Sequence, residues 1–273
     1  MRVGGSGPAL LLIHGFPTSS WDWCKIWPDL QRQFTLIAPD LLGFGFSAKP
    51  PGHDYRIGEQ TDLCLAAVAE SAVGEMHVVA HDYGDTVAQE LLARALEAKC
   101  PVTLRSVVLL NGGLFPETHR PLFTQRLLRS PAGWVVARLM TRDRLAAAMR
   151  RISGRHSPPE DEVVDAFWTL ASRANGRQAL PGLIRYIDER RANRERWVGA
   201  LLQTRVPLTL IAGLDDPISG EHMVARFREL LPHTRVFGLH GVGHYPQIEA
   251  PAAVIAAVRD VITAFPKSQQ LRP

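Results

Sequence analysis

Cysteines are scarce in this chain, and none has the spacing of a metal site. Cys24, Cys64 and Cys100 are odd in number and far apart. They form neither a disulfide framework nor a CxxC redox or zinc pattern, so we interpret them as reduced packing residues. We therefore expect no metal site and no cofactor.

Long apolar runs are also lacking. No run approaches the roughly 20 residues that cross a bilayer, and residues 1–8 lack the basic start and apolar stretch of a signal peptide. We expect a cytoplasmic protein with no membrane partner. With 273 residues, 46% of them hydrophobic, the chain is nevertheless long enough to bury a substantial core.

Basic residues are concentrated in one region of the chain. Between Phe115 and Ala200, 16 arginines stand against 9 acidic residues, a net charge of +7 that leaves −3 for the rest of a chain whose total is +4. Arginines interleaved with acids on short helices are typical of a solvated face. We expect no nucleic-acid partner and a monomer or homodimer.

Apolar runs of strand length alternate with helical patterns along the chain. Strands are predicted at residues 9–13, 35–38, 76–80, 105–110, 207–212 and 234–239. This alternation predicts an α/β protein with a mostly parallel central sheet. Residues 114–201 break it with helical periodicity and several prolines, so we expect an inserted helical cap there, on a core of residues 1–113 and 202–273.

The stretch from Val78 to Thr86 has the pattern of a nucleophile elbow with an aspartate at its centre. A strand pattern ends and a helical pattern begins at Asp82, and Ala80 and Gly84 are small enough for the sharp turn. Backbone N–H groups and the helix dipole at such a position favour an ionised carboxylate. The alternative is that Asp82 merely caps the helix.

Partners for this nucleophile are expected where other parallel strands end, because their carboxyl ends meet at one edge of the sheet. The strand at 207–212 leads to Asp215 and Asp216, and the strand at 234–239 leads to His244 in a glycine-rich turn. Asp82, Asp216 and His244 then follow the order nucleophile, acid, base. Asp215 remains an alternative acid, and His240 an alternative base.

These motifs resemble those of the α/β-hydrolases in the epoxide hydrolase and haloalkane dehalogenase group. The likeness covers almost the whole chain and includes the loop at 14–17 and the D-x-x-G-F-G-x-S-x-x-P stretch at 40–50. A narrower likeness, to the vertebrate mesoderm-specific transcript proteins, is carried by residues 81–92, 111–121 and 196–201. The resemblance implies an α/β-hydrolase fold with a helical cap, and oxyanion donors at the backbone N–H groups of Phe16 and Tyr83.

The amino terminus departs from that group. Its members have two antiparallel strands before the strand equivalent to 9–13, whereas only eight residues precede Ala9 here. We therefore expect those strands to be missing or the start to be truncated. Their absence would leave one edge of the sheet less protected.

An aspartate nucleophile restricts the substrate. Carboxylate attack on an ester would give an anhydride, whereas attack on saturated carbon gives an ordinary ester that activated water can cleave. This favours a small-molecule epoxide or haloalkane. For an epoxide, the leaving oxygen needs an acidic donor, and Tyr186 matches the position of a cap tyrosine in epoxide hydrolases. His119 is our candidate for the second donor, with His156 behind it.

Two other functions stay open at the level of sequence. A haloalkane dehalogenase needs N–H donors for the halide, which Trp168 or Trp197 in the cap would have to supply, because Tyr83 follows the nucleophile where tryptophan is usual. A ligand-binding protein on an inherited hydrolase scaffold is the third reading. The intact set of Asp82, Asp216 and His244 argues against this third reading.

Overall fold

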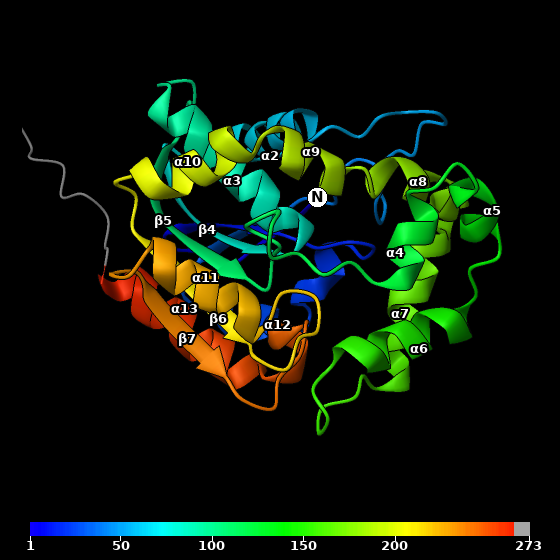
Figure 1. The fold of residues 1–273 in the computed structure, drawn as a ribbon. Helices are drawn as coiled ribbons and strands as arrows, with labels where there is room; N and C mark the ends of the chain where they lie inside the picture. The colour runs from blue at the N-terminus through cyan, green and yellow to red at the C-terminus, as the bar shows by residue number, and fades with distance from the viewer. Residues whose placement is uncertain (265–273) are drawn as a thin grey trace, which may run out of the picture.

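The computed structural model describes residues 1–264, which form a seven-stranded sheet with helices on both faces and a helical cap at one end (Figure 1). The strands lie in the order β1-β3-β2-β4-β5-β6-β7, and β1 alone is antiparallel to its neighbour. Their bounds are β1 Arg2–Gly4, β2 Ala9–Ile13, β3 Thr35–Ala38, β4 Glu75–His81, β5 Thr103–Leu110, β6 Leu208–Gly213 and β7 Arg235–Leu239.

All six predicted strands are present, with ends that differ by at most two residues. The expectation of missing strands before Ala9 is wrong for one of them. Strand β1 pairs with β3, Arg2 opposite Ala38 and Gly4 opposite Leu36, and so covers the edge of β3. Three residues are too few for a periodic signal, so only the pairing partner reveals this strand.

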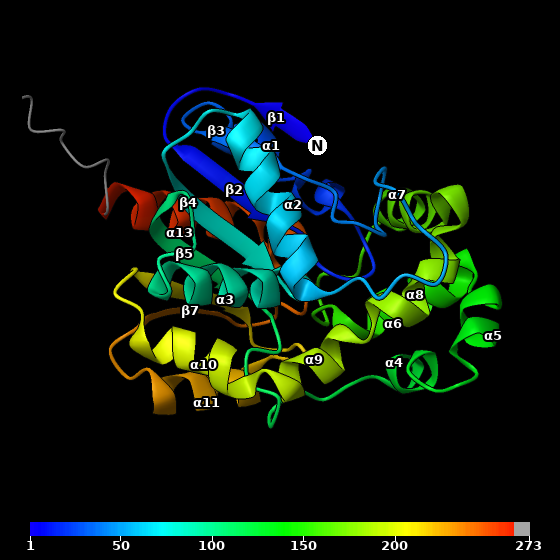
Figure 2. The same cartoon turned by 90° about the horizontal axis from the view of Figure 1, so that it is seen from above.

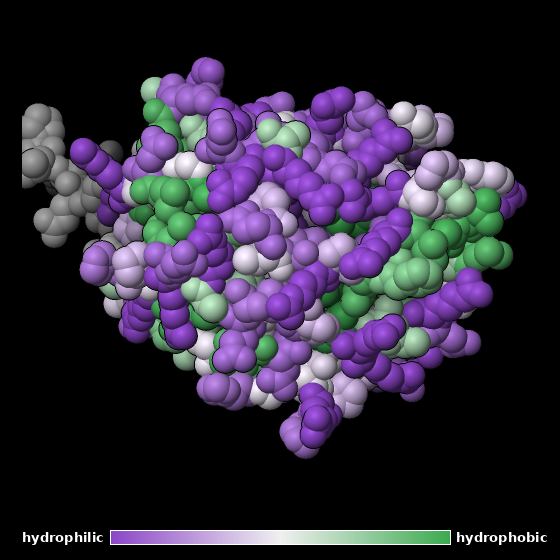
Figure 3. All heavy atoms as spheres, viewed as in Figure 1, coloured by the Kyte–Doolittle hydropathy of each residue, from purple (hydrophilic) through white to green (hydrophobic). Residues whose placement is uncertain are grey.

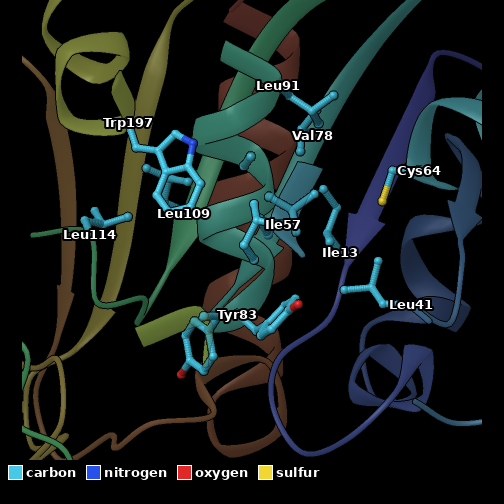
Figure 4. Close-up of a cluster of buried hydrophobic side chains, with 14 of the residues drawn as sticks. Ile13, Leu41, Ile57, Cys64, Val78, Tyr83, Leu91, Leu109, Leu114 and Trp197 are labelled. Carbon is cyan, nitrogen blue, oxygen red and sulfur yellow. The ribbon is translucent and has the colours of Figure 1, made fainter. Parts of the chain in front are cut away.

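Alternate residues of the central strands face two different cores. Leu11 and Ile13 of β2 belong to a large cluster on one face, whereas Leu10 and Leu12 belong to a second cluster on the other. Figure 4 shows part of the large cluster, where Val78 and Ile13 lie near Leu91. Both faces of a parallel sheet are buried in this way, which explains the uninterrupted apolar runs.

Helices of the core lie on these two faces. The large cluster includes residues of α2 (Ile57–Glu70), α3 (Tyr83–Leu96) and α11 (Glu221–Leu230). The second includes residues of η1 (Ser20–Trp23), α1 (Trp27–Leu30) and α13 (Pro251–Ala264). The short helix α12 (Pro246–Glu249) precedes α13 and contacts η1.

The predicted cap region is mostly helical. It contains α4 Phe123–Leu128, α5 Gly133–Arg138, α6 Arg142–Ile152, α7 Asp161–Ser172, η2 Arg173–Ala179, α8 Leu180–Leu183, α9 Tyr186–Ala192 and α10 Arg194–Gln203. Helices α4 to α8 gather at the end of the sheet towards which β4 points (Figure 2). Helix α10 instead packs along α3 of the core, and the Trp197 indole N–H donates to Glu90 at 2.8 Å.

The outer surface of the cap carries an apolar patch. Figure 3 shows apolar side chains gathered over α4 and α5, where Phe123 and Trp134 are 70% and 64% exposed. Hydrophilic side chains flank this patch (Figure 3). Within residues 1–264, no helix is long and apolar enough to cross a bilayer.

The turn between β4 and α3 depends on close backbone contact with the loop after β2. A Cβ atom added to Gly84 would lie 2.3 Å from the Ile13 carbonyl oxygen, and one added to Gly15 would lie 2.6 Å from Nδ1 of the buried His81. No L side chain fits at such distances without backbone movement. These two glycines therefore allow the two segments to touch.

A methyl group at Gly84 should destabilise the fold. We expect Gly84→Ala to lower the free energy of unfolding by about 1–3 kcal/mol through overpacking against the backbone of β2. Gly74→Ala is the matched control, because a Cβ there meets no atom within 4 Å, and it should change stability by less than about 0.5 kcal/mol. Urea unfolding followed by circular dichroism measures both, and equal effects would contradict the steric argument.

Candidate active site

Asp82 occupies the turn between β4 and α3 and presents its carboxylate to several groups. Its backbone has φ 48° and ψ −102°, a conformation that residues other than glycine rarely adopt. Oδ2 accepts a hydrogen bond from the Phe16 N–H at 3.1 Å, and Oδ1 lies 3.4 Å from the Tyr186 hydroxyl. The side chain makes no capping hydrogen bond to α3. The interpretation of Asp82 as a mere helix cap is therefore wrong.

The structure brings Asp216 and His244 to the same place from the ends of β6 and β7. His244 Nδ1 donates to Asp216 Oδ2 at 2.8 Å, and His244 Nε2 lies 4.0 Å from Asp82 Oδ2. Asp215, the alternative acid, instead accepts from the Gly241 N–H at the surface. His240 and His156 are exposed, so neither can reach Asp82 in this arrangement.

Four donors surround the Asp216 carboxylate and hold it in one orientation. Besides His244, Asn111 and the Ser219 hydroxyl donate to Oδ2 at 3.0 and 2.7 Å, and the Ile218 N–H donates to Oδ1 at 2.8 Å. Burial opposes the charge of Asp216, but His244 and these donors outweigh it and lower the pKa of the carboxyl below its usual value. Asp216 is thus a buried anion that fixes the His244 ring.

His244 carries a proton in the resting site. Burial alone would lower its pKa, but the carboxylates of Asp216 and Asp82 outweigh that effect and raise it to about 9. Both carboxylates contribute, so loss of the Asp82 charge would lower the pKa of His244 again. The protonation state of this imidazole is therefore coupled to the state of Asp82.

The loop that carries His244 is bonded to the cap. The His244 N–H donates to the Ile152 carbonyl at the end of α6, at 2.8 Å. Glu249 of α12 accepts from the Gly243 and Gly154 N–H groups, each at 2.8 Å, and from the Ser157 hydroxyl at 2.6 Å. One carboxylate therefore joins the histidine loop to the segment after α6, a contact that no sequence pattern predicts.

Tyr186 and His119 reach the site from two different parts of the cap region. Tyr186 begins α9 and is fully buried, with its ring 4.8 Å from that of Tyr83. His119 lies in the loop before α4, and neither of its ring nitrogens has a hydrogen-bond partner among the described residues. Burial and the charge of Arg190 lower the pKa of His119 to about 3, so the imidazole is neutral. A neutral imidazole has one N–H to donate.

The two predicted oxyanion donors differ in what they contact. The Phe16 N–H points at the Asp82 carboxylate. Tyr83 is the first residue of α3, where a backbone N–H has no partner within the helix. Its phenol ring is buried in the large cluster (Figure 4), and the hydroxyl donates to the Tyr55 carbonyl at 3.2 Å. Only the backbone of Tyr83 is therefore available to the site.

Comparison with known proteins decides the family. The sequence profile of the α/β hydrolase fold matches residues 8–251. The chain belongs to the α/β-hydrolase family. Within it, the hydrolase is 38% identical to the mesoderm-specific transcript homolog protein of Bos taurus over 96% of this chain and 81% of that protein. It is 40% identical to LipZ of Mycobacterium tuberculosis, provisionally named a hydrolase, over 94% of this chain and 89% of LipZ.

A solved structure supports the same family. A loop variant of the haloalkane dehalogenase DbeA from Bradyrhizobium elkanii has a TM-score of 0.75 to the hydrolase and is 27% identical, covering 97% of this chain and 92% of that one. The likeness extends over core and cap alike. The predicted resemblance, including that to the mesoderm-specific transcript proteins, is confirmed.

Sequence reasoning missed two buried groups next to Asp82. Arg190 of α9 donates to the Asp82 carbonyl at 2.8 Å and to Thr86 Oγ1 at 2.6 Å. His81 donates through Nε2 to the His244 carbonyl at 2.8 Å. The position of Arg190, four residues after Tyr186 on one helix face, was the available signal. Its burial became visible only in the folded hydrolase.

The site is closed in this structure. Asp82 and His244 are 3% and 2% exposed. A surface cleft of about 660 Å³ opens between η1 and α7, lined in part by Trp21, Phe46 and Asp165, but neither Asp82 nor His244 lines it. A small molecule could therefore reach Asp82 only if the surrounding segments moved. Within the described residues, no group of three His, Cys, Asp or Glu side chains is placed to hold a metal ion.

The raised pKa of His244 should make stability depend on pH. Its ordinary value is 6.5 and its folded value is about 9, so the stabilisation is complete below pH 6.5 and is lost as the pH rises through 9. We expect the free energy of unfolding to fall by up to about 3 kcal/mol across this interval. His244→Gln should flatten the curve. An NMR titration with the His244 midpoint near 6.5 would contradict this reading.

Proposed function

We propose that this hydrolase converts an epoxide into a vicinal diol through an alkyl ester on Asp82 that His244-activated water hydrolyses. The observation that carries the proposal is the set of groups around one carboxylate. A backbone N–H faces Oδ2, a phenol hydroxyl faces Oδ1, and an imidazole nitrogen lies 4.0 Å away. These are the nucleophile, acid and base that such a reaction needs.

The first step forms the ester. A carboxylate oxygen of Asp82 attacks a ring carbon, the bond from that carbon to the epoxide oxygen breaks, and the oxygen takes the proton of Tyr186. Neutral His119 is our second donor to the same oxygen. His244 keeps its proton during this step, which suits a pKa of about 9. The products are an ester at Asp82 and a phenolate at Tyr186.

The second step begins with a neutral Asp82 ester and a negatively charged Tyr186. Because Asp82 is now a neutral ester, the pKa of His244 falls, and its proton passes to the Tyr186 phenolate. The free imidazole, oriented by Asp216, takes a proton from water, whose oxygen attacks the Asp82 carbonyl carbon. The Phe16 and Tyr83 N–H groups stabilise the tetrahedral oxyanion. The bond from the Asp82 carbonyl carbon to the substrate oxygen then breaks, and this oxygen takes the second proton of the water. The diol is released, and the Asp82 carboxylate and the His244 imidazolium are regenerated.

The alternatives have less support. For a haloalkane, the candidate halide donor Trp197 is occupied, because its indole N–H is bonded to buried Glu90. Trp168 packs against the cluster around α6 and α7. A binding protein without catalysis would not need the strained backbone of Asp82, which holds its carboxylate beside the His244 imidazole. Because a haloalkane dehalogenase is structurally similar to this protein, haloalkanes are included in the experiment below.

Product analysis should identify the reaction. We expect diol from aryl or alkyl epoxides and no halide from matched haloalkanes, measured by chromatography and halide release. In His244→Gln the ester should persist, so intact-protein mass should rise by one substrate, with the label on Asp82 by peptide mapping. Asp82→Ala should remain unlabelled. Full turnover by Asp82→Ala would exclude the covalent mechanism, and halide release without diol would favour the dehalogenase.

Loss of the Tyr186 hydroxyl should slow ring opening. We expect Tyr186→Phe to reduce the rate of ester formation by about 100-fold, because the leaving oxygen loses its proton donor. Tyr55→Phe is the matched control, since the Tyr55 hydroxyl only donates to the Pro50 carbonyl. Rapid-quench mass spectrometry measures both rates. Equal rates in Tyr186→Phe and wild type would remove Tyr186 from the reaction.

A further inference from the structure

Arg190 is buried where the cap meets the nucleophile turn. It is 3% exposed, and two of its three guanidinium nitrogens donate to Thr86 Oγ1 and the Asp82 carbonyl. The mechanism above makes no use of this charge. A fully buried guanidinium is unfavourable unless its charge is offset.

The described part of the chain offers Arg190 no ion pair. Its Nη1 atom is buried without an acceptor. Asp85 lies in the same region but forms no ion pair with the guanidinium; burial raises the pKa of its carboxyl above the usual value, and the charge of Arg190 opposes that rise. Arg190 is therefore a buried cation that has no ion-pair partner among the described residues.

The two groups assigned to the leaving oxygen both lie near this guanidinium. Cζ of Arg190 lies 4.5 Å from the centre of the Tyr186 ring. A Cβ atom added to Gly113 would lie 2.5 Å from Arg190 Nη1 and 2.7 Å from His119 Nδ1, so these two nitrogens face the same glycine. Arg190 thus lies against both proposed donors.

We propose that Arg190 is a positioning residue that stabilises the negative charge formed at Tyr186 when the epoxide opens. This inference rests on the proposed function. In ring opening the Tyr186 O–H bond breaks, its proton moves to the leaving oxygen, and its electron pair stays on the phenolate beside Arg190. Alkylation makes Asp82 neutral and leaves a negative charge on Tyr186. The Tyr186 phenolate is then the counter-ion of the Arg190 guanidinium until it is reprotonated.

The acidity of Tyr186 supports this role. Burial and the nearby Asp82 carboxylate raise the pKa of Tyr186 far above its usual value, and Arg190 opposes that increase. Without the guanidinium, the phenol would be a still weaker acid in a dry site. Burial, and after it the charge of Arg190, also lower the pKa of His119, which favours the neutral form of the second donor.

A double-mutant cycle tests the proposal. Arg190→Gln removes the charge, Arg190→Lys retains it, and each is combined with Tyr186→Phe. We expect Arg190→Gln to slow ester formation from an epoxide by about 100-fold, and Arg190→Lys to recover at least about tenfold of that loss. In the Tyr186→Phe background, Arg190→Gln should cost less than about threefold, because the phenolate no longer forms.

A second readout separates this role from support of the Asp82 turn. Hydrolysis of the preformed ester, followed in the same quench experiment, should change less than about threefold in Arg190→Gln, since His244 has already reprotonated the Tyr186 phenolate when water attacks the ester. Thr86→Val, which removes one hydrogen bond to Arg190 but keeps its charge, is the matched structural control. It should slow ester formation far less than Arg190→Gln.

The outcomes distinguish the two proposals. Additive losses in the cycle, equal slowing of both steps, or failure of Arg190→Lys to recover activity would show that Arg190 only supports the turn, and would overturn the inference. Normal ester formation in folded Arg190→Gln would do the same and leave the epoxide reaction intact. Absence of ester and diol in the wild-type protein would instead refute the proposed function.

Discussion

The close contact between the loop after β2 and the first turn of α3 is the constraint on which the site depends. Glycines at 15 and 84 permit it, and it places the Phe16 N–H against the Asp82 carboxylate. The strained backbone of Asp82 is held from both sides, because its N–H donates to the Leu110 carbonyl and its carbonyl accepts from Arg190. The strain persists because its surroundings leave the turn no alternative.

The same arrangement places two negative and two positive groups close together in a buried site. Two carboxylates, Asp82 and Asp216, are offset by the His244 imidazolium and the Arg190 guanidinium, while burial favours the neutral forms of Asp85 and His119. Removal of any one charge alters the protonation of the others, since little water is present to screen them. The proposed ester would remove one such charge, and the same balance would then make His244 a base.

The cap contributes side chains to the candidate site as well as covering it. Its helix α9 supplies Tyr186 and Arg190, and the end of α6 accepts a hydrogen bond from the backbone of His244. Glu249 adds a second connection between the histidine loop and the segment after α6. Movement of α6 away from the core would break these hydrogen bonds. The boundary between α7 and η1, in contrast, contains an open cleft. The segment after α6 is therefore tied to the core near His244.

The sequence by itself determined the sheet and the chain order of the candidate residues. Apolar runs buried on both faces gave six strands, and the small residues around Asp82 marked the turn, because both signals are local. Strand β1 was beyond such reasoning, since three residues acquire their conformation only from β3. Only the tertiary structure decided which of Asp215 and Asp216 contacts His244. It also decided that Arg190 is a buried cation against Tyr186. These are contacts between segments far apart in the chain, and their energies depend on the removal of water when the core and cap close around them.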